Sequence, residues 1–217
     1  MTGGIILSFD DDHIEEWHEW LDFFNRHDVK ATFYVCNMGV FTDAQWWRLR
    51  EIQDAGHVIG HHGYRHLRAG VAGIDPASNP RLEGAPFYKD MAEFIDIEIM
   101  PGINALNGYG IHGRHYSYPF GNRNDASDEA LLKIFKSLRK GGRTVAPRQD
   151  FPRVFGALDF GKNDKAEMSG HEGVIHHARA GNIVSFYMHA PVSHRIKWLV
   201  NYASEFGLEF LTPEDLF

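Results

Sequence analysis

Cysteine is nearly absent from this chain, which has one cysteine, Cys36, among 217 residues. A single thiol excludes an intrachain disulfide. Cys36 ends a strand-like run, residues 31–36, so we expect a buried strand residue rather than a reactive thiol. Cysteine usage leaves the compartment open, because a reducing cytosol and a disulfide-free envelope location fit equally well.

Long hydrophobic runs are also missing. No segment approaches the roughly 20 apolar residues that cross a membrane as a helix. No signal peptide is evident, because residues 1–4 lead directly into a strand-like segment. We therefore expect a soluble protein without a membrane span, either cytoplasmic or an envelope or secreted protein whose leader has been removed.

Positive charge is in deficit: 22 Lys and Arg residues stand against 29 Asp and Glu residues, and the net charge is -7. This balance disfavours a nucleic-acid partner or an anionic membrane surface, since both require a positively charged face. The length and the 43% hydrophobic content suit one globular domain. With no internal repeat or linker, we expect residues 1–217 to form a single domain, and the oligomeric state is left open.

Strand-like and helix-like segments alternate along the chain. Apolar residues recur at helical spacing in several segments, one of which begins at a capping Asp43. The expected helices cover residues 14–24, 43–52, 87–99, 130–138, 172–179 and 196–206. The expected strands cover residues 5–9, 31–36, 58–59, 115–118, 143–146, 153–158, 183–189 and 208–211. Residues 67–86, rich in Gly and Pro, and residues 100–112 are expected to shape a groove.

This alternation predicts an α/β fold with a parallel sheet inside and helices outside. About seven or eight such units in one domain favour a (β/α) barrel, in which the chemistry lies at the carboxyl ends of the strands. Asp10, Asp11, His62 and His189 all stand at such ends. We therefore expect them to share one site.

The residue types at these ends indicate metal-assisted hydrolysis. One Asp with two His, such as His62 and His66, makes a metal site that leaves positions open for water and substrate. The second Asp of the Asp10-Asp11 pair is then available as a general base, and His189 as a general acid.

Four short motifs occur in a fixed order and together resemble a known family. They are Ser8-Phe9-Asp10-Asp11, His62-Gly63-Tyr64-Arg65-His66, Tyr118-Pro119-Phe120-Gly121 and Tyr187-Met188-His189. The chain is similar in these motifs to the polysaccharide deacetylases, the NodB-homology domain of carbohydrate esterase family 4. The resemblance extends over residues 4–212 and implies a distorted (β/α) barrel.

The resemblance also implies residue roles. Asp11, His62 and His66 match the metal ligands, usually of Zn²⁺, with Co²⁺, Ni²⁺, Mn²⁺ or Fe²⁺ as alternatives. Asp10 matches the base that takes a proton from metal-bound water, and His189 matches the acid that protonates the leaving amine.

The third motif matches one wall of the substrate groove. It contributes Tyr118, Pro119, Phe120 and Gly121, and the backbone N–H of Phe120 is our candidate for oxyanion stabilisation. Two further aromatic residues belong to the second and fourth motifs. We expect Tyr64 and Tyr187 to stack on a sugar ring.

Two positions depart from the family pattern. Gly63 stands where a Ser or Thr hydroxyl normally steadies the metal loop, and Ser117 stands where an Arg normally contacts the base. Arg153, with Arg114 and Arg143, is a candidate to replace that Arg. The family's fourth motif has no clear match, and Asp159 is a candidate to orient His189.

The resulting expectation is an enzyme that removes acetyl groups from an N-acetylglucosamine polymer or oligomer by metal-dependent hydrolysis. An amidohydrolase for a small non-sugar amide and an inactive glycan-binding domain remain as alternatives. A non-haem iron oxygenase also uses two His and one carboxylate, but β/α alternation does not suit it.

Overall fold

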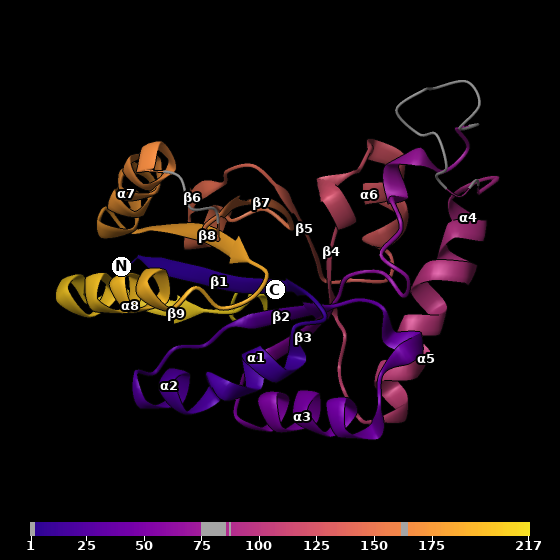
Figure 1. The fold of residues 1–217 in the computed structure, drawn as a ribbon. Coiled ribbons are helices and arrows are strands. Elements are labelled where there is room, and N and C mark those ends of the chain that lie inside the picture. The colour runs from indigo at the N-terminus through magenta and orange to yellow at the C-terminus, as the bar shows by residue number, and fades with distance from the viewer. Residues whose placement is uncertain (1–2, 75–85, 87, 162–164) are drawn as a thin grey trace.

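The computed structural model describes residues 3–74, 86, 88–161 and 165–217, with residues 165–170 described by their backbone only. Within this part of the chain, seven parallel strands close into a barrel (Figure 1). In order around the ring they are β1 (Gly4–Asp11), β2 (Thr32–Val35), β3 (Val58–His61), β4 (His115–Ser117), β5 (Ser137–Gly141), β7 (Val154–Asp159) and β8 (Asn182–Met188), which pairs again with β1. The expected distorted (β/α) barrel is confirmed.

Two short strands lie outside this ring. β6 (Val145–Pro147) pairs antiparallel with the beginning of β8, and β9 (Glu209–Leu211) pairs parallel with the beginning of β1. The ring itself is uneven. β1 and β8 share six paired positions, whereas β3 and β4 meet at the single pair His61 and Tyr116. The pairing of β3 with β4 is therefore the shortest in the ring.

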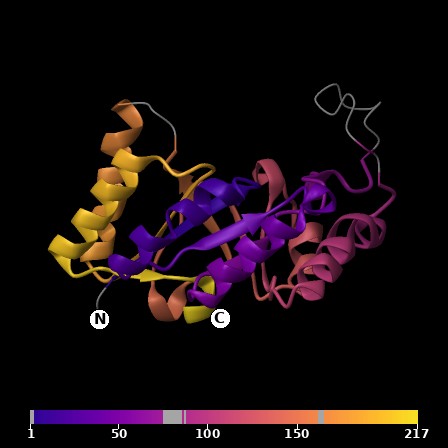
Figure 2. The same ribbon diagram turned by 60° about the horizontal axis from the view of Figure 1, so that its bottom comes forward.

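Helices surround the strands and lie at the two ends of the molecule. They are α1 (Ile14–Glu19), α2 (Leu21–Arg26), α3 (Asp43–Asp54), α4 (Met91–Phe94), α5 (Met100–Gly108), α6 (Asp125–Leu131), α7 (Lys165–Arg179) and α8 (Ser193–Phe206). In both views α7 and α8 lie at one end, and α4 and α5 lie at the other (Figures 1 and 2). None of the helices in the described residues is long and apolar enough to cross a membrane.

Alternation along β1 orients the catalytic candidates. Ile5, Leu7 and Phe9 pack in the main hydrophobic cluster, together with residues of the surrounding helices. Because successive strand residues point to opposite faces, Asp10 points away from that cluster, toward the barrel interior. Its exposure is 3%. The apolar strand β1 thus places the carboxyl group of Asp10 inside the barrel.

Several expected elements differ in the structure. The helix expected over residues 14–24 breaks at Trp20 into α1 and α2, and Thr42, not Asp43, caps α3 through a capping box with Gln45. Residues 100–108 form α5. Of the expected groove loop at residues 67–86, residues 75–85 lie outside the described part of the chain.

The largest difference concerns the helix expected over residues 130–138. α6 ends at Leu131, and Leu138 lies in strand β5. The apolar residues Leu131, Ile134, Phe135 and Leu138 happen to follow helical spacing although they belong to two elements and the turn between them. Three of them, Leu131, Phe135 and Leu138, pack in one cluster, so the spacing reflects a shared core rather than a shared helix.

Candidate active site

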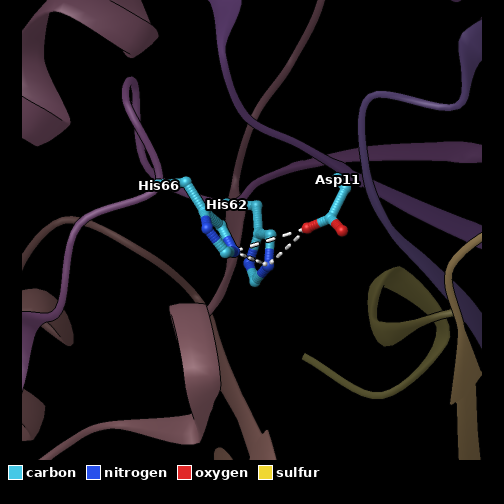
Figure 3. Close-up of side chains that lie close together, drawn as sticks. All are labelled: Asp11, His62 and His66. Atoms are coloured by element: carbon cyan, nitrogen blue, oxygen red, sulfur yellow. Dashed lines mark hydrogen bonds and ion pairs between the residues drawn. The ribbon is translucent and has the colours of Figure 1, made fainter.

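The three expected metal ligands converge at the carboxyl ends of β1 and β3. His62 Nε2 and His66 Nε2 lie 3.5 and 3.4 Å from Asp11 Oδ1, and the two imidazole nitrogens are 3.2 Å apart. Figure 3 shows both rings directed toward the Asp11 carboxylate. Three ligand atoms within 4.8 Å of one another, two nitrogens and one carboxylate oxygen, fit a zinc-type ion with open positions.

The protonation of these residues also suits a cation. Burial raises the pKa of Asp11, but the hydrogen bond and charge of His62, with the charges of His189 and His66, lower it to about 2. Burial and the neighbouring His62 lower the pKa of His66. At neutral pH the site therefore holds a carboxylate and a neutral imidazole, the forms that bind metals.

The orientation of His62 is set by its second ring nitrogen. His62 Nδ1 lies 2.8 Å from the backbone carbonyl oxygen of Ser117 on β4, and the ring is buried. A carbonyl accepts but cannot donate, so Nδ1 carries a proton, and Nε2, which faces Asp11, is the ring nitrogen that can bind a metal. This is the arrangement that a metal-binding histidine requires.

Backbone conformation at the site is strained. Five non-glycine residues in the described chain have positive φ, and three of them, Asp11 (83°), His66 (63°) and Phe120 (59°), line one cavity. Such conformations cost about 1–3 kcal/mol each and persist where the surroundings enforce them, which is common at functional sites.

Asp10 is held by an arginine that sequence reasoning missed. The guanidinium of Arg139, on β5, donates to Asp10 Oδ2 and to the Ser117 hydroxyl. It is 2% exposed and lies over the rings of Tyr187, at 4.5 Å, and Tyr34, at 5.5 Å. Asp10 Oδ1 is buried and accepts no hydrogen bond from any described residue. One carboxylate oxygen is thus neutralised by Arg139 and the other is left for a ligand.

Arg153 does not replace the family arginine, so that expectation is wrong. It donates to the backbone carbonyls of Leu132, Phe135 and Lys136, where it holds the turn between α6 and β5. Arg139 was missed because residues 130–138 had been assigned to one helix, which hid the strand that carries it.

His189 stands at the rim of the same site. Its Nε2 is 3.8 Å from Asp11 Oδ2, and its side chain is 48% exposed. The indole N–H of the fully buried Trp17 donates to the His189 backbone carbonyl at 2.9 Å, which anchors the end of β8 to α1. The carboxylate of Asp159 lies 3.5 Å from the hydroxyl of Tyr187, whose ring neighbours His189. That Asp159 orients His189 stays a prediction.

These residues line one cavity of about 250 Å³. Its lining includes Asp10, Asp11, His62, His66, Tyr118, Phe120, Gly121, Arg139, Gly141, Tyr187 and His189. A larger recess of about 680 Å³ lies near the amino ends of β1 and β2, beside Lys30 and Glu209, away from this chemistry.

The expected groove residues are distributed unevenly. Phe120 is 61% exposed, and its ring lies between His66, at 4.6 Å, and the guanidinium of Arg68, at 3.9 Å. Tyr118 is buried, with its hydroxyl donating to Asp128 at 2.8 Å, and Pro119 is also buried. Tyr64 lines a neighbouring recess with Asp12 and Val40. Phe120 and Tyr187 are therefore the aromatic rings best placed to meet a substrate.

Comparison with known proteins gives a family match. The polysaccharide deacetylase model matches residues 2–134. No curated protein sequence matches the chain. Among solved structures, the chitin deacetylase of the fungal pathogen Colletotrichum lindemuthianum is similar, with a TM-score of 0.67 and 14% identity over 100% of this chain and 88% of that one.

Two further structures share the fold. A family 4 carbohydrate esterase from Streptomyces lividans, solved in complex with acetate, has a TM-score of 0.56 and 16% identity over 95% of this chain and 90% of that one. A carbohydrate esterase family 4 pseudoenzyme from Bacillus anthracis has a TM-score of 0.60 and 14% identity over 96% of this chain and 63% of that one. The family therefore includes a member described as lacking enzymatic function, so the state of the site itself must decide the activity of this chain.

Proposed function

Because the chain belongs to the polysaccharide deacetylase family, we propose that it hydrolyses the acetamide of an N-acetylated sugar, of N-acetylglucosamine type, in a polymer or oligomer. The observation that carries this proposal is the meeting of an Asp/His/His ligand set, a second carboxylate and a further histidine in one cavity. The products are acetate and a free amine.

Asp11, His62 and His66 are proposed to hold a divalent metal, Zn²⁺ first and Co²⁺, Ni²⁺, Mn²⁺ or Fe²⁺ as alternatives. When bound, such a metal polarises the amide carbonyl and makes water a better nucleophile at neutral pH. The carbonyl oxygen of Ser117 contributes by keeping His62 Nε2 free to bind.

Asp10 is proposed as the general base. Its Oδ2 lies 3.9 Å from His62 Nε2, so its carboxylate borders the proposed metal site. Arg139 binds Oδ2, and Oδ1 accepts no hydrogen bond from any described residue, so Oδ1 is the atom assigned to take the proton. Arg139 supplies the countercharge that a buried carboxylate requires.

His189 is proposed as the general acid. It lies across the Asp11 carboxylate from the two other histidines and is half exposed, so it can exchange protons with solvent between turnovers. A protonated imidazole there gives its proton to the amine nitrogen as the C–N bond breaks. The proton taken by Asp10 and the proton given by His189 balance the hydrolysis.

The cavity favours a sugar over a large planar ligand. At about 250 Å³ it falls below the usual range of small-molecule sites, about 300–1,000 Å³, and suits one reacting residue of a chain that continues outside it. The exposed Phe120 ring at the rim offers a surface on which a sugar ring can stack. The phenol of Tyr187, whose pKa burial and Asp159 raise to about 12, stays a neutral hydrogen-bond donor.

The test is acetate release from N-acetylglucosamine oligomers, with zinc-loaded and chelated protein in parallel and a small non-sugar N-acetyl amide as the competing substrate. We expect release from the oligomers that requires metal. Asp10→Asn and His189→Ala should each lower kcat by about 10²–10⁴-fold, the usual contribution of a general base or acid. Metal-dependent release from the small amide alone would favour the amidohydrolase alternative.

Matched controls are exposed residues of the same type on the surrounding helices. Asp22→Asn and His194→Ala lie outside the cavity and should leave kcat unchanged. Binding of the oligomers without acetate release, in metal-loaded wild-type protein, would contradict the proposal and indicate a glycan-binding domain.

A further inference from the structure

The loop that carries His66 lacks the hydroxyl residue that the family normally has at position 63. We propose that the buried Glu98 takes over that task and is the positioning residue that keeps the loop His62–His66 in its metal-binding shape. This inference rests on the proposed metal site, and it assigns to Glu98 a role in metal affinity rather than in proton transfer.

Glu98 accepts three of the backbone N–H groups in and beside this loop. Glu98 Oε1 accepts the N–H groups of Arg65 and Leu67, both at 2.9 Å, and these two residues flank His66. The Glu98 carbonyl accepts the N–H of Tyr64 at 3.0 Å. The N–H of Gly63 donates to His61 Nδ1 at 2.9 Å. Four backbone N–H groups on either side of His66, those of Gly63, Tyr64, Arg65 and Leu67, are therefore satisfied, three of them by Glu98.

Burial makes these contacts strong. Glu98 is 0% exposed, and its second oxygen meets the Arg65 guanidinium, Nε at 3.4 Å. Hydrogen bonds from backbone N–H groups to a buried carboxylate are charge-assisted, and breaking them leaves buried polar groups unpaired. The left-handed φ of His66, 63°, needs such support because the conformation is unfavourable by itself.

The local fold brings Glu98 to this place. Residues Ile95–Ile99 form a π-helical turn between α4 and α5. Such turns inside helices are rare and are frequent at functional sites. Here the turn places the carboxylate and the carbonyl of one residue against the same loop. Ile99, the residue after Glu98, contributes as well. Its backbone carbonyl oxygen lies 3.2 Å from Nε2 of His61, the histidine whose Nδ1 accepts the N–H of Gly63.

Gly63 and Glu98 fit each other sterically. A Cβ atom at position 63 would lie 2.7 Å from Glu98 Oε1, closer than real contacts allow, and Gly63 has φ of 81°. A Ser or Thr at 63 is therefore incompatible with this placement of Glu98. The glycine and the buried carboxylate form one unit that substitutes for the family's hydroxyl.

The experiment measures zinc affinity by competition with a chromophoric chelator, for the full chain and three Glu98 variants. Glu98→Ala should weaken binding by about 10–100-fold, the usual effect of removing a partner that orients a metal ligand. Glu98→Asp keeps the charge but withdraws the carboxylate by one methylene, so we expect a similar loss. Glu98→Gln keeps an oxygen at Oε1 for both N–H groups and should stay within a few-fold of wild type.

Controls and a second readout keep the outcome interpretable. Asp96→Ala removes an exposed carboxylate from the same π-helical turn and should not change zinc affinity. If Glu98→Ala does not fold, the other two variants still separate side-chain length from charge, because Glu98→Asp changes the length and Glu98→Gln changes the charge. The visible spectrum of their Co²⁺ forms then reports the geometry of the metal site. Equal zinc affinity of wild type and folded Glu98→Asp would overturn the inference. No zinc binding by wild type would instead contradict the proposed metal site.

Discussion

At the scale of single residues, the site depends on an exchange of positions between neighbouring strands. Ser117 occupies the place on β4 where the resemblance implied an arginine, and Arg139 on β5 reaches across to it and to Asp10. The two residues are paired neighbours in the sheet, Ser117 with Arg139. A small side chain on one strand therefore makes room for a long one from the next, and the charge partner of Asp10 is retained.

Removal of this arginine should disable the site. Arg139→Met leaves the buried Asp10 without its countercharge, a change of the kind that costs about 3–5 kcal/mol in other proteins. We expect kcat for deacetylation to fall by at least about 10²-fold, with zinc affinity little changed because Arg139 contacts no metal ligand. The measurements are steady-state kinetics and chelator competition on the same preparations.

A swap provides the sharper comparison. In the double variant Ser117→Arg with Arg139→Ser the arginine returns to the family position, and we expect partial recovery of kcat relative to Arg139→Ser alone. Arg143→Met, at an exposed position two residues after the end of β5, serves as the control. Full activity of Arg139→Met would contradict the assigned role.

At the scale of elements, the carboxyl ends of strands collect the chemistry, and a helix anchors one of these ends. α1 follows directly after the Asp10-Asp11 pair and places Trp17 beneath the end of β8. The indole N–H ties the His189 carbonyl to the helix that begins three residues after Asp11, a proposed metal ligand. The position of the proposed acid is thus coupled to that of the proposed base through a single buried side chain.

Trp17→Phe tests this coupling. The loss of one hydrogen bond, about 0.5–1.5 kcal/mol, predicts a decrease in kcat of roughly twofold to tenfold with unchanged zinc affinity. Trp20→Phe is the matched control, since Trp20 packs on the same helices but lies outside the cavity. An equal decrease in both variants would point to general loosening of the core instead of a specific effect on His189.

At the scale of the whole molecule, the barrel buries several histidines that the proposed chemistry does not use. Burial lowers the pKa of His57 to about 4 and of His61 to about 3. It also lowers the pKa of His115 to about 4, although Glu214 acts in the opposite direction. In the unfolded chain these side chains titrate near 6.5. The folded barrel therefore keeps all three neutral at pH values where the unfolded chain protonates them.

This difference predicts acid-sensitive stability. Between about pH 6.5 and pH 4 the unfolded state binds more protons, so the free energy of unfolding should be full above pH 6.5 and decrease as pH falls. Each unit of pKa difference corresponds to about 1.4 kcal/mol per group. Urea unfolding of chelated protein at pH 7, 6 and 5 measures the slope. A free energy of unfolding that does not change over this range would contradict the burial of neutral histidines.

The sequence by itself determined the barrel and grouped most of the residues that line the cavity. Strand-terminal polar residues are readable because parallel strands end at one edge, so Asp10, Asp11, His62 and His189 could be grouped before any geometry was known. The motifs that contain these residues are short, but each can be recognised from the sequence around the end of a single strand. The same is true of Phe120 and Tyr187, which belong to the quoted motifs and line the cavity.

Only the tertiary structure decided the partners of these residues. Arg139 lies 129 positions from Asp10, and Glu98 lies 33 and 31 positions from Arg65 and Leu67. Neither stands in a recognisable motif, since Arg139 follows a segment with helical spacing and Glu98 lies in an apparently ordinary helix. Contacts between distant segments depend on which strands are neighbours and on how a helix turn is wound. Periodicity reports the direction of a side chain within its own element and carries no information about what meets it from another.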